Sequence, residues 1–178
     1  NLNHLIRQLA STNLSLRTHA THELVERIGA AAVPEMRSLV ANGDSPEQRA
    51  HAVWVLQRLG GLTDADWHQA LSDPAALVRV HAIKALAARD SWDAAVAAAA
   101  IACLEDADGF VRRSAVEGLG RHPDPAAIEP LLKLLATADP LHQNLIHAAR
   151  MALRDTLSSL GDFADLEARF GQSPEHWT

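Results

Sequence analysis

The sequence has few aromatic residues, one cysteine and no long apolar run. Aromatic side chains make up 4% of its 178 residues and tyrosine is absent, while alanine is abundant, a composition that favours closely packed helices over a sandwich or barrel. The single cysteine, Cys103, excludes an internal disulfide. The longest wholly apolar run, Ala94–Leu104, is too short to cross a bilayer. We therefore predict a helical protein without membrane insertion.

Lysine is also scarce, and the net charge is negative. Lys84 and Lys133 are the only lysines, and the formal net charge is -6 at pH 7. Nucleic acids and anionic lipids attract basic surfaces, so this balance argues against both as partners. We predict that the chain binds no nucleic acid.

An arginine recurs along the chain, with an alanine three residues after it and a leucine seven residues after it. The four complete copies are Arg17-Ala20-Leu24, Arg49-Ala52-Leu56, Arg79-Ala82-Leu86 and Arg112-Ala115-Leu119. A fifth copy keeps Ala149 and Leu153 but has Ile146 in place of the arginine. A period of roughly 30–34 residues indicates stacked structural repeats, because one such unit cannot bury its apolar face alone.

Each repeat is predicted to contain a helix A, a short turn and a helix B. In the third repeat we expect helices over 64–71 and 78–88, and in the fourth over 92–104 and about 110–120. The fold class is thus all-α: a right-handed α-solenoid of five antiparallel helix pairs over residues 1–160. Residues 161–178 are expected to form a capping helix and a tail. The chain begins at Asn1, and we expect it to be one domain of a larger protein.

The recurring arginine is predicted to form a structural ladder between repeats. An aspartate stands six residues before two of the arginines, Asp73 before Arg79 and Asp106 before Arg112. A partly buried guanidinium suits a carboxylate and helix-end carbonyl groups. The predicted ladder consists of Arg17, Arg49, Arg79, Arg112, Asp73 and Asp106. It should be weakest at both ends, because Ser11 replaces the aspartate in the first repeat and Ile146 replaces the arginine in the fifth.

The turns that carry these residues resemble the HEAT repeat family, in which an Asp-x-x-x-x-Val-Arg segment joins two antiparallel helices. Here the segments run from Asp73 to Arg79 and from Asp106 to Arg112. The resemblance covers about residues 2 to 157. It implies that the B helices line an inner, concave surface and that the protein is a non-catalytic scaffold that binds other proteins or domains.

The candidate surface for a partner follows from helical geometry. Residues two, five and nine positions after each arginine should point away from the core. The candidate partner-binding residues on these positions are His19, His51, Trp54, Arg58, His81 and Lys84. Trp54 is interpreted either as a contact to another domain, since an exposed tryptophan is costly, or as a side chain packed over a neighbouring helix.

The three histidines His19, His51 and His81 share one slot of consecutive repeats. A metal site is not predicted from them, because adjacent helices place equivalent side chains about 8–10 Å apart, too far for shared bonds of about 2.1 Å. A structural or solvated role and a partner contact remain open for them.

Enzymes that resemble this architecture provide the alternative function. Deoxyhypusine hydroxylase resembles it but binds iron through several His-Glu pairs, whereas this chain has only His22-Glu23 in such a position. The chain has no Gly-rich phosphate loop, metal-ligand cluster or Gly-x-Ser-x-Gly elbow. We predict no catalytic residue, no cofactor and no metal. The alternative is an enzyme that uses this fold, such as a bilin-lyase-like or DNA-glycosylase-like protein.

Three segments point to a particular context. Residues 49–60, 78–86 and 145–155 are similar to the HEAT segment of large bacterial dehydrogenase-like proteins from planctomycetes, in which a propeller precedes the repeats and a c-type haem domain follows them. The chain lacks Cys-x-x-Cys-His and so cannot attach haem itself. The resemblance implies a domain that spaces or docks redox modules, in a periplasmic or membrane-associated protein. Without that context we expect a cytoplasmic protein.

Overall fold

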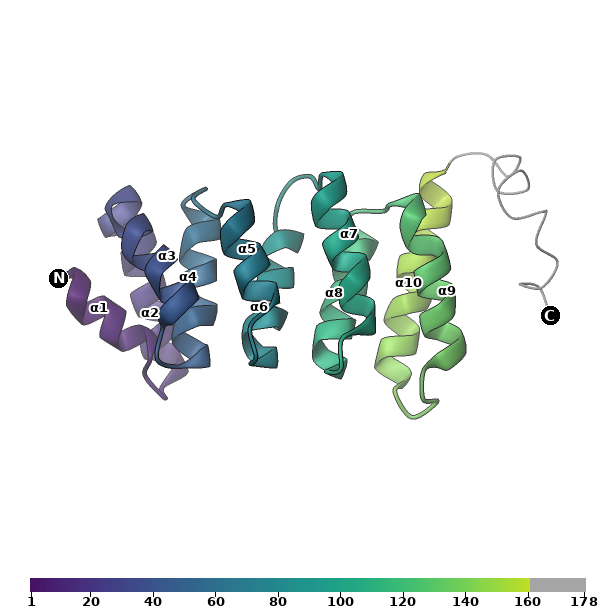
Figure 1. The fold of residues 1–178 in the computed structure, drawn as a ribbon, viewed down its shortest axis with the longest axis horizontal. Coiled ribbons are helices and arrows are strands. Elements are labelled where there is room, and N and C mark those ends of the chain that lie inside the picture. Colours follow the sequence, from purple (N-terminus) through teal and green to yellow (C-terminus); the bar gives the residue numbers. More distant parts are fainter. Residues whose placement is uncertain (161–178) are drawn as a thin grey trace.

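The computed structural model of the protein describes residues 1–160, and this part of the chain is helical without any strand. The α-helices follow one another in a row from the N-terminus (Figure 1). Within the described part they are α1 (Leu2–Leu9), α2 (Leu14–Glu23), α3 (Val33–Asn42), α4 (Pro46–Arg58), α5 (Asp64–Leu71), α6 (Ala76–Ala87), α7 (Ala94–Ala102), α8 (Gly109–Arg121), α9 (Ile128–Thr137) and α10 (Gln143–Ser159). The predicted all-α fold is confirmed.

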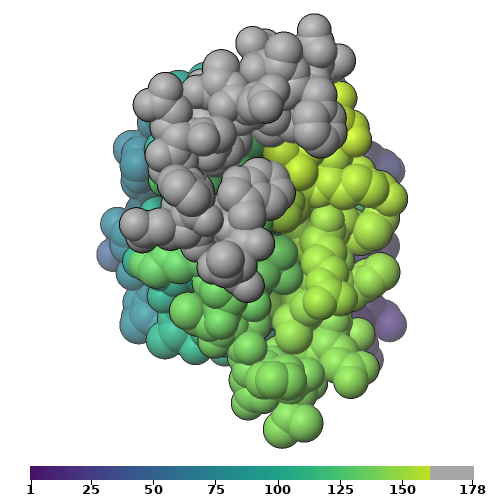
Figure 2. Space-filling model, turned by 90° about the vertical axis from the view of Figure 1, so that its right-hand side faces the viewer, coloured from purple at the N-terminus to yellow at the C-terminus, as the bar shows by residue number. Residues whose placement is uncertain are grey.

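The helices form five pairs stacked side by side. Each odd-numbered helix is the A helix of a repeat and packs against the B helix that follows it, and each B helix packs against the B helix of the next repeat. Figure 2 views the stack from the side of its last pair, with α9 and α10 next to each other. This arrangement is the predicted α-solenoid. The predicted capping helix and tail over 161–178 lie outside the described residues.

Small side chains determine how closely the B helices approach. The alanine three positions after each ladder position is fully buried in all five repeats: Ala20, Ala52, Ala82, Ala115 and Ala149. An alanine methyl group occupies little space, so the backbones of neighbouring B helices can come near each other. Larger side chains, such as Ile83, Leu86 and Leu119, fill the layer beside them and are also fully buried. The core is therefore continuous along the stack.

The turns between A and B helices hold the ladder residues in place. In the fourth repeat, the Asp108 side chain accepts hydrogen bonds from the backbone N–H groups of Phe110 and Val111 and starts α8. Such a cap satisfies N–H groups that have no partner inside the helix. The preceding carboxylate, Asp106, accepts the N–H of Asp108 at 2.8 Å. The turn thus fixes the Asp106 carboxylate just before the start of α8.

Helix bounds agree with the sequence-based prediction except near capping residues. Helix α5 has the predicted bounds, and α6 starts two residues earlier than predicted. The predicted helix over 92–104 is shorter, because the Asp93 side chain accepts the N–H of Val96 and starts α7 at Ala94. The last turn, Cys103–Glu105, is a 3-10 helix (η3).

Gly118 of α8 lies close to Trp92, in the loop between α6 and α7. A Cβ atom there would lie 2.8 Å from Cη2 of Trp92. That ring is fixed, since it stacks on His122 with centroids 4.6 Å apart and its Nε1–H donates to the Leu86 carbonyl at 2.8 Å. The ring therefore has little freedom to move away from an added methyl group.

We expect Gly118→Ala to lower the free energy of unfolding by about 1 kcal/mol, because overpacking outweighs the better helix propensity of alanine. Urea unfolding would measure the change. Gly109→Ala is the matched control in the same helix, since the nearest atom to its added Cβ lies 3.6 Å away. Equal stability of the two variants would show that the Trp92 contact is not restrictive.

Candidate interaction surface

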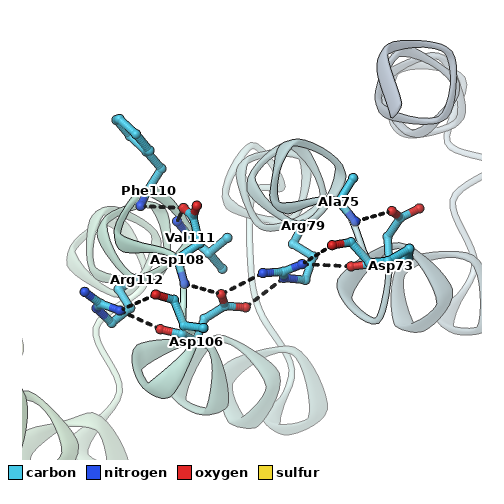
Figure 3. A network of polar contacts seen from close by, with 10 residues as sticks. Asp73, Ala75, Arg79, Asp106, Asp108, Phe110, Val111 and Arg112 are labelled. Atoms are coloured by element: carbon cyan, nitrogen blue, oxygen red, sulfur yellow. Dashed lines mark hydrogen bonds and ion pairs between the residues drawn. The ribbon is translucent and has the colours of Figure 1, made fainter. Parts of the chain in front are cut away.

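Arg79 joins the third repeat to the fourth. Its Nε and Nη2 donate to the two carboxylate oxygens of Asp106, each at 2.8 Å. Its Nη1 donates to the backbone carbonyl of Asp73 at 2.9 Å, in the turn of its own repeat (Figure 3). Arg49 makes the same contacts one repeat earlier, with the Asp73 carboxylate at 2.6 and 2.9 Å and the Gly43 carbonyl at 2.9 Å. Each arginine therefore bonds both its own turn and the next one.

These ion pairs are largely shielded from water. The side chains of Arg49 and Asp73 are 14% and 4% exposed, and those of Arg79 and Asp106 are 16% and 14% exposed. The hydrogen bonds from Arg79 lower the pKa of Asp106. Burial raises the pKa of Asp73, but hydrogen bonds from Arg49 and from the Ala75 N–H outweigh it, so that this pKa is also lowered. Both carboxylates are thus stabilised in their charged form.

The two outer arginines have no carboxylate partner within residues 1–160. Arg17 donates to the Ser11 carbonyl at 2.6 Å and to Nε2 of His51 at 3.2 Å. Asp44 lies one residue beyond the ladder position of the second repeat and forms no ion pair with Arg17. Arg112 donates to the carbonyls of Asp106 and Ala107 at 2.7 and 3.0 Å. Among residues 1–160, carboxylates therefore bind the ladder arginines only in the centre of the stack.

A groove of about 440 Å³ lies on the side of the stack that the B helices form, here called the B-helix face. It spans α2, α4 and α6. Four of the candidate residues line it: His51, Trp54, Arg58 and His81. His19 and Lys84 are exposed on the same helices, α2 and α6, but do not line the groove. The structure thus brings four of the six candidates together.

Polar side chains in this groove form two hydrogen-bonded groups, which a contact between two histidine rings joins. Trp54 donates from Nε1 to Nδ1 of His81 at 2.7 Å, and the ring of His81 stacks near that of His51 with centroids 6.5 Å apart. His51 also contacts Thr21, with 2.9 Å between Nδ1 and Oγ1. The Thr21 hydroxyl donates to the Arg17 carbonyl, so His51 Nδ1 must carry the proton and Nε2 must accept from Arg17.

At neutral pH both histidines are therefore uncharged in the folded protein. Burial, reinforced by the charge of Arg17 and by His81, lowers the pKa of His51 to about 4. Burial and the charges of Lys84 and Arg17 lower the pKa of His81. Protonation of either ring would place a hydrogen on the nitrogen that now accepts a bond. Trp54, which the sequence left open, packs over the neighbouring helix and is half-buried.

One geometric expectation was wrong. The residue two positions after each arginine was expected to point away from the core, yet Ser114 in α8 is buried and His51 and His81 are half-buried. The close approach of the B helices places this position against the neighbouring helix. The rings of His51 and His81 are consequently nearer than the 8–10 Å expected from helix spacing. No group of three metal-ligating side chains occurs within residues 1–160.

Sequence reasoning missed three exposed apolar residues at the start of B helices, here called the apolar row, which Glu47 interrupts in the second repeat. Leu14, Leu77 and Phe110 are 62%, 39% and 74% exposed. Leu14 and Leu77 line the groove, and Phe110 projects away from the A helices in Figure 3. Leu77 and Phe110 both stand two residues before a ladder arginine. This repeated position, before the arginine and not after it, was the available signal.

Another cross-repeat ion pair joins two A helices. Arg37 of α3 donates from Nε to the two carboxylate oxygens of Asp66 in α5 at 3.0 and 3.1 Å. Asp66 is buried and also accepts from the Thr63 hydroxyl in the capping box of α5. The Thr63-x-x-Asp66 spacing could have revealed the cap, but nothing in the sequence indicated Arg37 as its partner.

The sequence was compared with known protein families. The sequence pattern of the family described as HEAT repeats matches residues 65–154, about half of the chain. No curated protein matches the sequence. Within the described part of the chain, no helix has the length and apolarity that a bilayer span requires.

The depressed histidine pKa values predict a loss of stability in mild acid. The folded pKa of His51, about 4, lies below its unfolded value of 6.5, so the unfolded chain binds more protons between these values and the free energy of unfolding falls as the pH is lowered. Urea unfolding measures the free energy of unfolding at pH 7.5 and at pH 5. Its fall between the two should be smaller in His51→Gln than in the wild type by about 1 kcal/mol, after allowance for solvent screening. The exposed His19→Gln is the control. An unchanged fall in His51→Gln would contradict the assigned proton positions.

Proposed function

The chain belongs to the HEAT repeat family, and on that premise we propose that it is a protein-binding scaffold whose B-helix face holds the partner. Members of this family commonly serve as interaction scaffolds and are generally non-catalytic. The observation that supports the proposal best is the row formed by Leu14, Leu77 and Phe110. Large exposed apolar side chains in a row are typical of a surface that another protein covers.

The groove beside this row offers the polar contacts of an interface. Arg58 and Glu47 line it with opposite charges, and the rings of Trp54 and His81 line it as well. Tryptophan and arginine are the residue types that most often anchor interfaces. The indole of Trp54 is already fixed by its hydrogen bond to His81, so little conformational entropy would be lost when a partner packs on it.

A protein fits this face better than a nucleic acid does. The net charge of the chain is -6, and Lys84 and Arg58 share the face with Glu47 and Glu117. A phosphate backbone requires a run of cations, whereas a mixed surface suits a protein. We propose further that the partner is a neighbouring domain of the same polypeptide. In the redox context that the sequence resembles, that role would be to space or dock the modules.

Substitution of the apolar row tests the proposal. The full chain, immobilised, is exposed to extracts and to purified neighbouring domains, and each captured protein is then purified for a measurement of its Kd. In the double variant Leu77→Ser/Phe110→Ser, the Kd for the captured protein should rise at least 30-fold, which corresponds to about 2 kcal/mol. Both residues are exposed, so the stack should remain folded. Leu141→Ser is the matched control, because Leu141 is 86% exposed but lies in the turn before α10.

Three results would contradict parts of the proposal. Undiminished binding by the double variant, or equal loss in Leu141→Ser, would remove the B-helix face from the interface. Turnover of a substrate by the purified chain, abolished by a substitution on this face, would show a catalytic role instead.

A further inference from the structure

The Arg112 side chain is held in the same way as that of Arg79, which binds a carboxylate. Its Nη1 donates to the carbonyls of Asp106 and Ala107 at 2.7 and 3.0 Å. Nη1 of Arg79 donates in the same way to the carbonyls of Asp73 and Pro74, at 2.9 and 3.2 Å. In Arg79 this pose directs Nε and Nη2 to Asp106. Within residues 1–160, the same two nitrogens of Arg112 meet no carboxylate.

The fifth repeat explains why this last position is open. Asp139 follows Arg112 by the same number of residues as Asp106 follows Arg79, and its Oδ1 accepts the N–H of Leu141 at 2.8 Å, as Asp106 accepts that of Asp108. The turn is one residue longer, however, since Ile146 is seven residues after Asp139 while Arg112 is six after Asp106. No ion pair joins Arg112 to Asp139 in the described part of the chain.

Both residues instead line one cleft of about 1290 Å³ between the A helices of the fourth and fifth repeats. Its walls are mainly apolar and come from α7 and α9, with Ile101 and Leu132 among them. The exposed pair of Lys133 and Glu105, 2.6 Å apart, links α9 to η3. The cleft is larger than most small-molecule sites and can take a short polypeptide segment.

We propose that Arg112 and this cleft bind a polypeptide segment of a partner that carries one aspartate between apolar residues. A guanidinium held by carbonyl groups is pre-organised for a bidentate contact with a carboxylate, as Arg79 demonstrates. The apolar walls accommodate the flanking side chains. Glu129 and Asp139 also line the cleft, so a segment with several negative charges would be repelled. This site is on the A-helix side and is independent of the B-helix face.

A peptide based on the chain's own turn is a direct probe. The turn that Arg79 binds runs from Leu104 to Phe110. The probe is the end-blocked peptide Leu-Ala-Asp-Ala-Ser-Gly-Phe, in which only the aspartate at the third position is charged, and its control has asparagine at that position. Each is titrated into the full chain, and NMR follows the Nε–Hε resonance of Arg112 and the amides of α7 and α9.

We expect a saturable shift of the Arg112 resonance with the aspartate peptide and at least tenfold weaker binding of the asparagine peptide. Arg112→Gln should weaken binding of the aspartate peptide by a similar factor, whereas Arg113→Gln, the neighbouring exposed arginine, should not. Asp139→Asn should strengthen binding severalfold, because it removes a like charge from an exposed position while keeping an Oδ1 that can accept the N–H of Leu141.

Equal affinity for the two peptides would overturn the proposal, as would equal losses in the Arg112 and Arg113 variants. Shifts confined to α2, α4 and α6 would also overturn it, because they would place the peptide on the B-helix face. Weaker binding by Asp139→Asn would show that Arg112 does not receive the carboxylate.

Discussion

The guanidinium at the start of each central B helix is the contact on which the order of the repeats depends. Arg49 and Arg79 bond the carbonyl of their own turn and the carboxylate of the next, so each fixes the distance between two repeats as well as the end of one helix. Apolar packing alone favours burial but not one relative position. A bidentate ion pair in a poorly hydrated environment does specify position, and breaking it leaves a buried charge without a partner.

The two proposed binding surfaces depend on this regularity and on the places where it ends. Because the B helices start at equivalent positions, residues just before each arginine form a row, and Leu77 and Phe110 are exposed there. At the first repeat boundary, His51 takes the place of a carboxylate opposite Arg17 and is kept neutral. At the last boundary a longer turn leaves Arg112 facing a cleft. Departures from the repeat thus produce the chemically distinctive sites.

The sequence predicted the fold well because the repeat period and the spacing of alanine and leucine encode it directly. It also predicted that the ladder arginines bond an aspartate, but it left open whether that aspartate belongs to the same or a neighbouring repeat. In the structure, Arg79 binds the carboxylate of the next repeat, Asp106. The packing of His51 and Ser114 could not be predicted from helical geometry, because it depends on how closely two B helices approach. The cleft beside Arg112 depends on a one-residue difference in a turn, which changes no pattern of apolar residues.

A double-mutant cycle on Arg79 and Asp106 tests most directly whether the ladder couples the repeats. The free energy of unfolding is measured for the wild type, Arg79→Ala, Asp106→Ala and the double variant. The structure predicts a coupling of about 1–3 kcal/mol, compared with about 0.3–0.5 kcal/mol for the exposed pair of Arg113 and Glu117. A coupling no larger than that of the exposed pair would mean that apolar packing alone sets the stack.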